Sequence, residues 1–259
     1  MPNPRTYQTE AIIIKKIKLG EADRILTLYT PHLGKIQAVA KGVRRPRSKL
    51  SGHLELITNS QVSLARGRNL DTIIGSQTID SFLLLKNDLW LTSCALYVTE
   101  LINQFTADHV ENAPLFQLVL ETMHRLCLAR DIELLLHYFE LHLLNEVGYR
   151  PQLQQCVSCH SSLKPVTNAF SPMSGGVLCP RCSRSQFLTY PLPVNALKVL
   201  RLLQSSDYDT AGKLKMNPEL SHELDEVMSH YLEYLLDREV KSSTWLDVLR
   251  EQAKQTAPS

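Results

Sequence analysis

Four cysteines in two C-x2-C pairs constrain the fold of this chain more than any other feature. They are Cys156 and Cys159 and, after nineteen intervening residues, Cys179 and Cys182. This order matches the C-x2-C-x15–20-C-x2-C spacing of a four-thiolate zinc site. Each C-x-x-C turn places two thiolates on one side of an ion that takes tetrahedral ligands at about 2.3 Å. Gly175, Gly176 and Pro180 add turn residues, so the spacing predicts a ribbon hairpin around one structural Zn²⁺.

Two other uses of paired cysteines are considered. A thioredoxin-like redox site expects one C-x-x-C beside a βαβ pattern, which is not present here. Two disulfides do not suit a chain for which we expect no export signal. Four thiolates fill the coordination sphere, so no catalysis at the metal is expected; His160 could replace one ligand but is expected to be an exposed neighbour. Cys94 and Cys127 fall in helical apolar patterns and are expected in the core.

The first 80 residues have the pattern of short β-strands. β-Branched and alternating apolar residues predict strands at residues 9–17, 24–30, 35–41, 54–66 and 70–79. Pro31, Gly34 and Gly42 punctuate them. Five strands in about 70 residues fit a small barrel such as an OB-fold. An SH3-like barrel would give much the same pattern, so the strand count leaves the topology open.

The rest of the chain is predicted to be mostly helical. Asp88 is a candidate N-cap for a helix through residue 105, Pro114 suits the first turn of a second helix to about residue 128, and Asp131 caps a third. The cysteine segment interrupts this pattern, and helices resume after Pro193. The clearest of the later helices has one apolar stripe formed by Leu220, Leu224, Val227, Met228, Tyr231 and Leu235.

Composition narrows the class of protein. The chain has 259 residues, of which 44% are hydrophobic and 21% charged, as in a packed globular protein of about two domains. No apolar run approaches the roughly 18 residues that span a bilayer, so we expect a cytoplasmic protein with no membrane partner. Residues 1–80 hold 13 basic and 6 acidic residues, whereas residues 81–259 hold 15 and 20. This asymmetry favours a polyanion as the partner of the first 80 residues.

A basic loop concentrates that charge. The nine residues 41–49, KGVRRPRSK, carry five cations and are interrupted by Gly42 and Pro46, which predicts a flexible loop on the barrel. A cationic loop in this position suits phosphate contacts with nucleic acid. The alternative is a solvated loop or a nuclear-localisation-like run. The candidate nucleic-acid-binding residues are Arg24, Lys35, Lys41, Arg44, Arg45, Arg47, Lys49, Arg66 and Arg68.

Aromatic residues and enzyme motifs are both sparse. Residues 1–80 contain only Tyr7 and Tyr29 as aromatics, whereas barrels that stack bases offer several rings. We therefore expect binding through backbone charge, with little base preference and steep salt dependence. The chain lacks a phosphate-binding P-loop, G-x-G-x-x-G, G-x-S-x-G and H-E-x-x-H. His137 and His142 are expected at the surface or the core edge, Glu21 and Asp23 are expected to form a turn that pairs with Arg24, and we predict no enzyme.

Two stretches resemble the RecO family of bacterial recombination mediators. The first is EADRILTLYTPHLGK at residues 21–35, followed by AKGVRRP at 40–46 and Ser48. The second is LLNEVG at residues 143–148, followed by Pro151, both C-x2-C pairs and Gly175–Gly176 between them. His160 departs from the family pattern, in which glycine commonly follows the second cysteine. The helices beyond residue 190 carry no motif that can be aligned.

The resemblance implies an N-terminal OB-fold, a helical domain and a zinc-binding segment. It implies DNA repair and recombination through binding of single- and double-stranded DNA, annealing of complementary strands, and loading of RecA onto strands coated by single-strand-binding protein. The implied partners are RecR and the acidic tail of single-strand-binding protein, with RecA indirect, and the implied location is the bacterial nucleoid. By position, the matching basic residues are Arg24, Lys35, Lys41, Arg44 and Arg45.

The prediction as a whole is an α+β multidomain protein. Residues 1–80 form an OB-fold nucleic-acid-binding domain, and residues 81–259 form a helical domain that includes the zinc-binding segment 150–190. The alternative function is a zinc-containing protein-interaction module in which the basic barrel is only supportive.

Overall fold

The computed structural model describes residues 5–237, 240–243 and 246. The chain divides between Cys127 and Leu128 into two compact units, each described by itself below. Within the described ranges, no helix is both long and apolar enough to cross a membrane.

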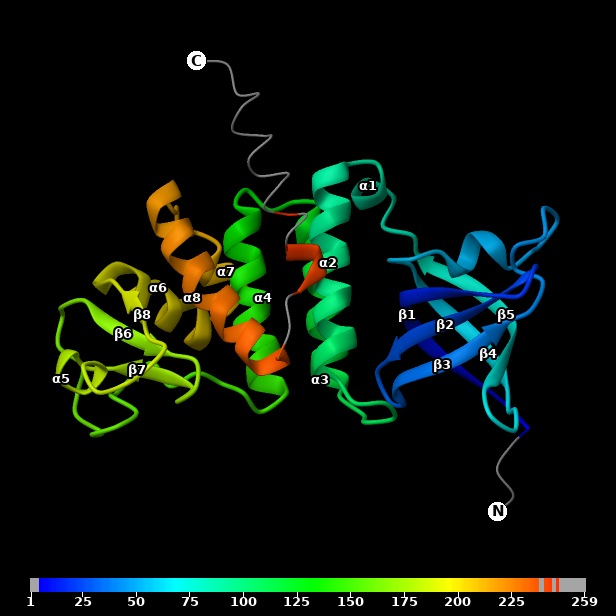
Figure 1. The fold of residues 1–259 in the computed structure, drawn as a ribbon. Coiled ribbons are helices and arrows are strands. Elements are labelled where there is room, and N and C mark those ends of the chain that lie inside the picture. Colours follow the sequence, from blue (N-terminus) through cyan, green and yellow to red (C-terminus); the bar gives the residue numbers. More distant parts are fainter. Residues whose placement is uncertain (1–4, 238–239, 244–245, 247–259) are drawn as a thin grey trace. The chain divides into compact units, whose positions relative to one another are not determined.

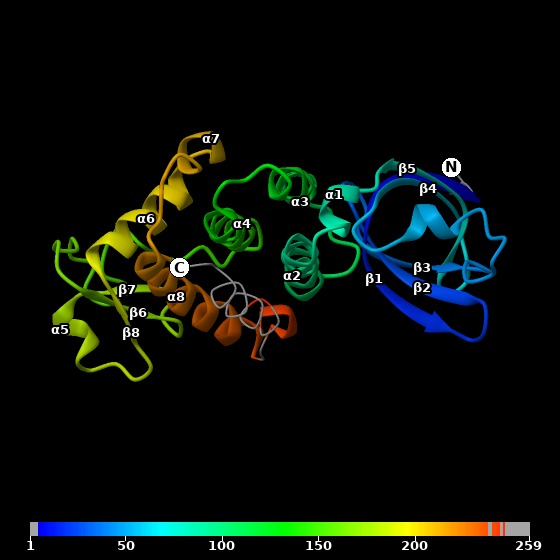
Figure 2. The same cartoon turned by 90° about the horizontal axis from the view of Figure 1, so that it is seen from above.

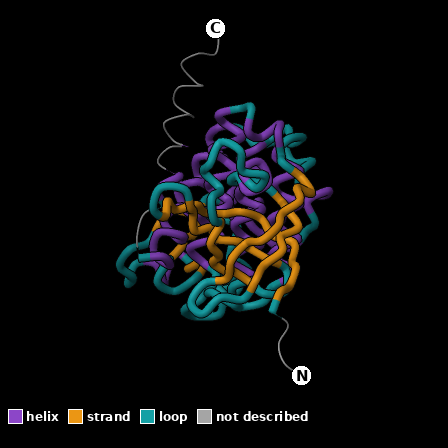
Figure 3. The backbone as a smooth tube through the Cα atoms, turned by 90° about the vertical axis from the view of Figure 1, so that its right-hand side faces the viewer, coloured by secondary structure: helices purple, strands orange, loops and turns teal. Residues whose placement is uncertain are grey.

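The first unit begins with a closed five-stranded barrel (Figures 1 and 2). Its strands, orange in Figure 3, are β1 (Thr6–Leu19), β2 (Asp23–Thr30), β3 (Gly34–Ala40), β4 (Asn59–Ala65) and β5 (Asp71–Asp80). Around the barrel the order is β1-β2-β3-β5-β4, and β4 closes onto β1. The pairs are antiparallel except for β3 with β5, which is parallel. This order resolves the open choice of topology in favour of the OB-fold.

The barrel encloses its own apolar core. Alternate residues of β2 and β3, such as Leu26, Leu28 and Ala38, point inward, as the period of a half-buried strand requires. Val43 of the basic loop also lies in this core and is 3% exposed. The loop is therefore anchored in the barrel at one residue while its charged residues remain outside.

One predicted strand begins later than the sequence indicates. Residues 54–66 were expected as a single strand, but Ser51–Leu54 forms a short 3-10 helix (η1) and β4 begins at Asn59. Ile57 has φ 55, a left-handed conformation that ends extended pairing. Its backbone N–H donates to the carbonyl of Ile13, and its side chain is buried. Leu54 and Ile57, two of the apolar residues that predicted a strand here, are buried without belonging to one.

Three helices complete the described part of the first unit: α1 (Leu83–Lys86), α2 (Leu89–Phe105) and α3 (Ala113–Leu126). Asp88 caps α2 as predicted, because its carboxylate accepts a hydrogen bond from the N–H of Leu91. Asn112 does the same for α3 with the N–H of Leu115. Cys94 is buried in α2, in agreement with a core position.

The second unit combines helices with a small sheet. The helices are α4 (Ile132–Glu146), α5 (Pro180–Ser183), α6 (Val194–Ser205), α7 (Tyr208–Ala211) and α8 (Pro218–Leu236). The strands are β6 (Asn168–Ser171), β7 (Gly176–Leu178) and β8 (Tyr190–Leu192), in the order β7-β6-β8. Asp131 caps α4 as predicted, and Gly148, at φ 86, follows its end. The α+β architecture with a barrel first and a cysteine-bearing helical part second is confirmed.

Candidate metal centre and nucleic-acid interface

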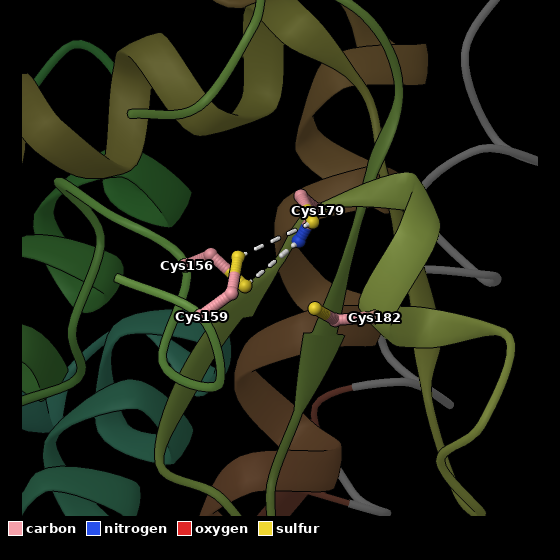
Figure 4. Close-up of side chains that lie close together, drawn as sticks. All are labelled: Cys156, Cys159, Cys179 and Cys182. Atoms are coloured by element: carbon pink, nitrogen blue, oxygen red, sulfur yellow. Dashed lines mark hydrogen bonds between the residues drawn. The ribbon is translucent and has the colours of Figure 1, made fainter. Parts of the chain in front are cut away.

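The four cysteines of the two C-x2-C pairs meet in the second unit. Their sulfur atoms all lie within 4.8 Å of one another (Figure 4). Cys159 Sγ and Cys179 Sγ, one from each pair, are 3.8 Å apart. A tetrahedron with metal–sulfur distances of about 2.3 Å has edges of about 3.8 Å, so the cluster has the size and the soft donors that a metal ion needs.

Two different turns present the thiolates. After the first pair, the N–H of His160 donates to the carbonyl of Cys156, and His160 adopts φ 57. The left-handed region favours glycine, which explains why glycine is common at this position in the family pattern. In this chain His160 adopts the same conformation. In the second pair, Cys179 precedes the one-turn helix α5, whose Pro180 has a φ suited to a first turn. His160 is exposed and does not belong to the cluster, as expected.

Gly176 allows the two halves of the cysteine segment to approach closely. A Cβ at this position would lie 2.5 Å from the carbonyl oxygen of Gln152 and 2.7 Å from Cγ1 of Val157. The N–H of Val177 donates to the carbonyl of Gln152, and the N–H of Val157 donates to the carbonyl of Val177. Only glycine lets the chain before the first pair lie against the strand that leads to the second pair.

Local hydrogen bonds favour thiolates in the cluster. Ser161, through its side chain and its backbone, lowers the pKa of Cys159 to about 5. The backbone of Cys182 lowers the pKa of Cys179. A hydrogen bond with Ser158 acts to lower the pKa of Cys182 as well, but hydrogen bonds with Cys159 and Cys179 and desolvation outweigh it and raise that pKa to about 11, because a thiol that donates to its neighbours keeps its proton. A bound cation would displace this proton and stabilise the fourth thiolate.

The basic loop of the barrel, residues 41–49, exposes its cations. Lys41, Arg44, Arg45, Arg47 and Lys49 are all exposed, and none forms an ion pair with a carboxylate in the described part of the chain. Their charge is therefore available to an external anion.

The same loop is less free than its composition indicates. The carboxylate of Asp23 accepts a hydrogen bond from the N–H of Gly42 at 2.7 Å, and the carbonyl of Ala22 accepts one from the N–H of Arg44 at 2.9 Å. The loop is thus tied to the turn between β1 and β2. Asp23 serves as this tether, whereas the expected pairing of this turn with Arg24 is not what the structure shows: Arg24 lies 3.5 Å from Glu55.

Two of the candidate nucleic-acid-binding residues already have partners inside the first unit. Arg24 pairs with Glu55, as does Lys16. The ammonium of Lys35 donates to the carbonyls of Asn103 and Thr106 at 2.8 and 2.6 Å and lies 3.4 Å from Asp108. The remaining two candidates, Arg66 and Arg68, are exposed beside the turn between β4 and β5.

Of the two aromatic rings of the barrel, Tyr29 is closed to a base and Tyr7 is half-buried beneath an arginine. Tyr29 is fully buried, and its ring lies 6.1 Å from that of Phe116. The guanidinium of Arg66 lies over the ring of Tyr7 at 4.9 Å, and the Tyr7 hydroxyl donates to Asp71. The accessible chemistry of the barrel is therefore positive charge.

Sequence reasoning missed a buried histidine of the second unit that lies between two carboxylates. His137 was expected at the surface or the core edge, yet it is 2% exposed, with Nδ1 2.9 Å from Glu140 and Nε2 3.3 Å from Asp225. Burial acts to lower the pKa of His137, but the two carboxylates raise it to about 10. Glu140 three residues later on the same helix was a local signal; Asp225 on α8 was not predictable from spacing.

Both the N-terminal and the C-terminal part of the chain match known protein families. Residues 3–82 match the family model for the N terminal of recombination protein O, and residues 86–244 match the model for its C terminal. The chain is 47% identical over 250 residues to the DNA repair protein RecO of Dehalococcoides mccartyi strain CBDB1, covering 96% of this chain and 98% of that protein.

Relatives with lower sequence identity also match nearly the whole chain. The DNA repair protein RecO of Roseiflexus sp. strain RS-1 is 40% identical, covering 98% of this chain and 90% of that protein. The one of Halalkalibacterium halodurans is 32% identical, covering 94% and 95%. Both the barrel and the cysteine-bearing helical part lie within these matches. This chain belongs to the RecO family of DNA repair proteins, which are mediators rather than enzymes.

Proposed function

We propose that this protein mediates homologous recombination by binding single- and double-stranded DNA through the barrel and annealing complementary strands. The observation that carries the proposal is the basic loop, residues 41–49, whose five exposed cations have no carboxylate partner among the described residues. Arg66 and Arg68 extend this charge on the barrel. Arg24 and Lys35 have a structural role, since Arg24 pairs with Glu55 and Lys35 joins β3 to the end of α2.

Annealing follows from the kind of contact that this surface makes. Two strands can pair only if their mutual repulsion is screened while their bases remain free. Phosphate contacts neutralise the backbone, and few rings are offered for stacking, since Tyr29 is buried and Tyr7 lies under the guanidinium of Arg66. A surface of this kind holds strands with little base preference.

The cysteine cluster is proposed to bind one Zn²⁺ with a structural role. Four thiolates leave no open coordination position for a substrate. Cys156, Cys159, Cys179 and Cys182 would hold the ion, and the ion would join the chain before β6 to the chain after β7.

Family membership supports the remaining partners. We propose that the protein acts with RecR, binds the acidic tail of single-strand-binding protein through its helical part, and so helps to load RecA in the bacterial cytoplasm, where the nucleoid lies. The alternative is that the cysteine segment and the helices bind protein partners while the basic barrel only supports them.

The basic loop can be tested in the full-length protein. If about five phosphates are neutralised on a single strand, the logarithm of the binding constant should fall with the logarithm of salt at a slope of about −3.5. In Arg44→Ala/Arg45→Ala/Arg47→Ala, the slope should become less steep by about 2.1, and annealing of complementary strands should be lost.

Lys213 and Lys215 provide a matched control, because both are exposed and lie in the second unit. The variant Lys213→Ala/Lys215→Ala should keep the slope and the annealing rate of the wild-type protein. Unchanged annealing in the loop variant would overturn the proposal and favour the protein-interaction alternative.

A further inference from the structure

The second unit contains a long segment without any carboxylate. Between Glu146 and Asp207 the chain has sixty residues and no aspartate or glutamate. The rest of residues 81–259 holds nine basic and 20 acidic residues, so this segment is a basic island in an acidic part of the chain. Its basic residues are Arg150, Lys164, Arg181, Arg184, Lys198 and Arg201.

Three of these cations line one hollow. It has a volume of about 100 Å³ and lies between the loop that precedes β6 and the first half of α6. Lys164 comes from the loop, and Lys198 and Arg201 come from the helix. Because Lys198 and Arg201 are three residues apart on α6, they occupy the same helical face. None of the residues that line the hollow is acidic.

Hydrogen bonds to backbone carbonyls hold two side chains of the hollow, Arg201 and Asn168, in position. Arg201 donates from Nε to the carbonyl of Leu153 at 2.8 Å and from Nη2 to that of Gln154 at 3.4 Å. Asn168 donates from Nδ2 to the carbonyls of Lys164 and Val166 at 3.3 and 2.7 Å, which holds the loop that carries Lys164. These acceptors are neutral, so they orient the groups without cancelling their charge.

The cations of the hollow are not paired with carboxylates in the part of the chain that the structure describes. No carboxylate of the described ranges forms an ion pair with Lys164, Lys198 or Arg201. Like charges brought together in this way repel one another, and an anion between them relieves the repulsion. Lys164 and Lys198 each bring a mobile ammonium that can reach a phosphate oxygen, and Arg201, whose Nε and Nη2 donate to carbonyls, adds its fixed positive charge.

We propose that this hollow binds a backbone phosphate of nucleic acid, so that the second unit makes its own contact with DNA. The inference rests on the proposed function in that DNA is the polyanion, but it concerns a site separate from the basic loop. The occupant is a nucleic acid rather than an acidic peptide because the cations extend along the whole acid-free segment, including Arg150, Arg181 and Arg184. A regularly charged polymer can use charges distributed in this way.

The test uses the full-length protein and a fluorescent oligothymidylate strand over a salt series. Lys164 and Lys198 are exposed, so Lys164→Ala/Lys198→Ala should fold normally. Loss of two phosphate contacts should reduce the steepness of the salt slope by about 1.4. If the binding curves converge near about 1 M salt, affinity should be roughly 70-fold weaker at about 50 mM. The Lys213→Ala/Lys215→Ala variant makes the same charge change elsewhere in the second unit and should match the wild-type protein.

The outcomes separate this inference from the proposed function. A wild-type protein that binds no DNA overturns both. DNA binding that weakens in the basic-loop variant but not in Lys164→Ala/Lys198→Ala overturns the hollow alone. An oligoglutamate peptide whose binding is lost in Lys164→Ala/Lys198→Ala, with an unchanged DNA salt slope, would show that the hollow takes an acidic peptide instead.

Discussion

At the scale of single residues, the lysines of the barrel have two different roles. Lys35 is 11% exposed in its side chain, and its ammonium satisfies two carbonyls at the C-terminal end of α2. Those carbonyls have no partner within the helix, and the helix dipole makes this end negative, so a lysine is favoured there. Lys41, six residues further on, is exposed and has no such partner among the described residues.

These two lysines give a matched pair of substitutions. Lys35→Met should reduce the free energy of unfolding by about 2 kcal/mol, because it leaves two carbonyls without their charged donor. Lys41→Met should leave stability unchanged and weaken DNA binding at low salt. Urea denaturation and strand binding of both variants would check this, and a stable Lys35→Met protein with weakened binding would make Lys35 a direct phosphate contact.

His137 stabilises the second unit by joining two helices. It lies on α4 between Glu140 of the same helix and Asp225 of α8. With its pKa raised to about 10 by these carboxylates, the imidazole is protonated at neutral pH. Removal of the charge would leave carboxylates facing each other in a buried place.

The pH dependence of this contact has a definite sign. A pKa raised from 6.5 to about 10 on folding gives stability that is complete below pH 6.5 and is lost as pH rises toward 10. His137→Gln should reduce stability by about 3 kcal/mol near pH 7, and its difference from the wild-type protein should narrow at higher pH. Hydrogen exchange of α4 amides at several pH values would measure this difference in the free energy of unfolding. His222→Gln, an exposed change on α8, is the control, and a difference that grows with pH would contradict the assignment.

At the scale of elements, the small sheet of the cysteine segment contributes little stability of its own. β6 has four residues, and β7 and β8 have three each. Sheets this short bury little apolar surface, so a metal cross-link between the chain before β6 and the chain after β7 adds stability that the strands lack.

Metal removal should therefore affect the second unit first. Purified protein should contain one Zn²⁺ per chain by elemental analysis, and Cys179→Ser should lose it together with thermal stability, more than it loses affinity for DNA. Cys127→Ser is the matched control, since Cys127 is only half-buried and outside the cluster, and it should keep the metal. Full metal content in Cys179→Ser would exclude four-thiolate coordination.

The elements also differ in how well local sequence predicts them. The caps of α2 and α4 were predicted at Asp88 and Asp131, because a cap depends on a side chain and an N–H three residues away. The strand expected at residues 54–66 was too long, because the conformation of Ile57 depends on β1 and on the barrel core. Local patterns predict elements whose partners are local.

At the scale of the whole molecule, positive charge is present in both units. The basic loop carries it in the first unit, and the acid-free segment carries it in the second. The acidic residues of residues 81–259 lie outside that segment, so the small net charge of +2 does not show that each unit contains a strongly basic stretch of sequence. If both stretches bind DNA, as we propose, the protein can hold strands while leaving their bases accessible.

The sequence by itself determined the order of barrel, helices and cysteine segment, and the identity of the four clustered thiols. These features depend on strand and helix periods, on capping residues and on the short spacing within each C-x-x-C turn. Only the tertiary structure decided that Lys35 caps α2, that His137 meets Asp225, and that Lys164 faces the same hollow as Lys198 and Arg201. The physical reason is that each of these contacts joins segments far apart in the chain, and their approach is set by packing around a core rather than by neighbouring residues.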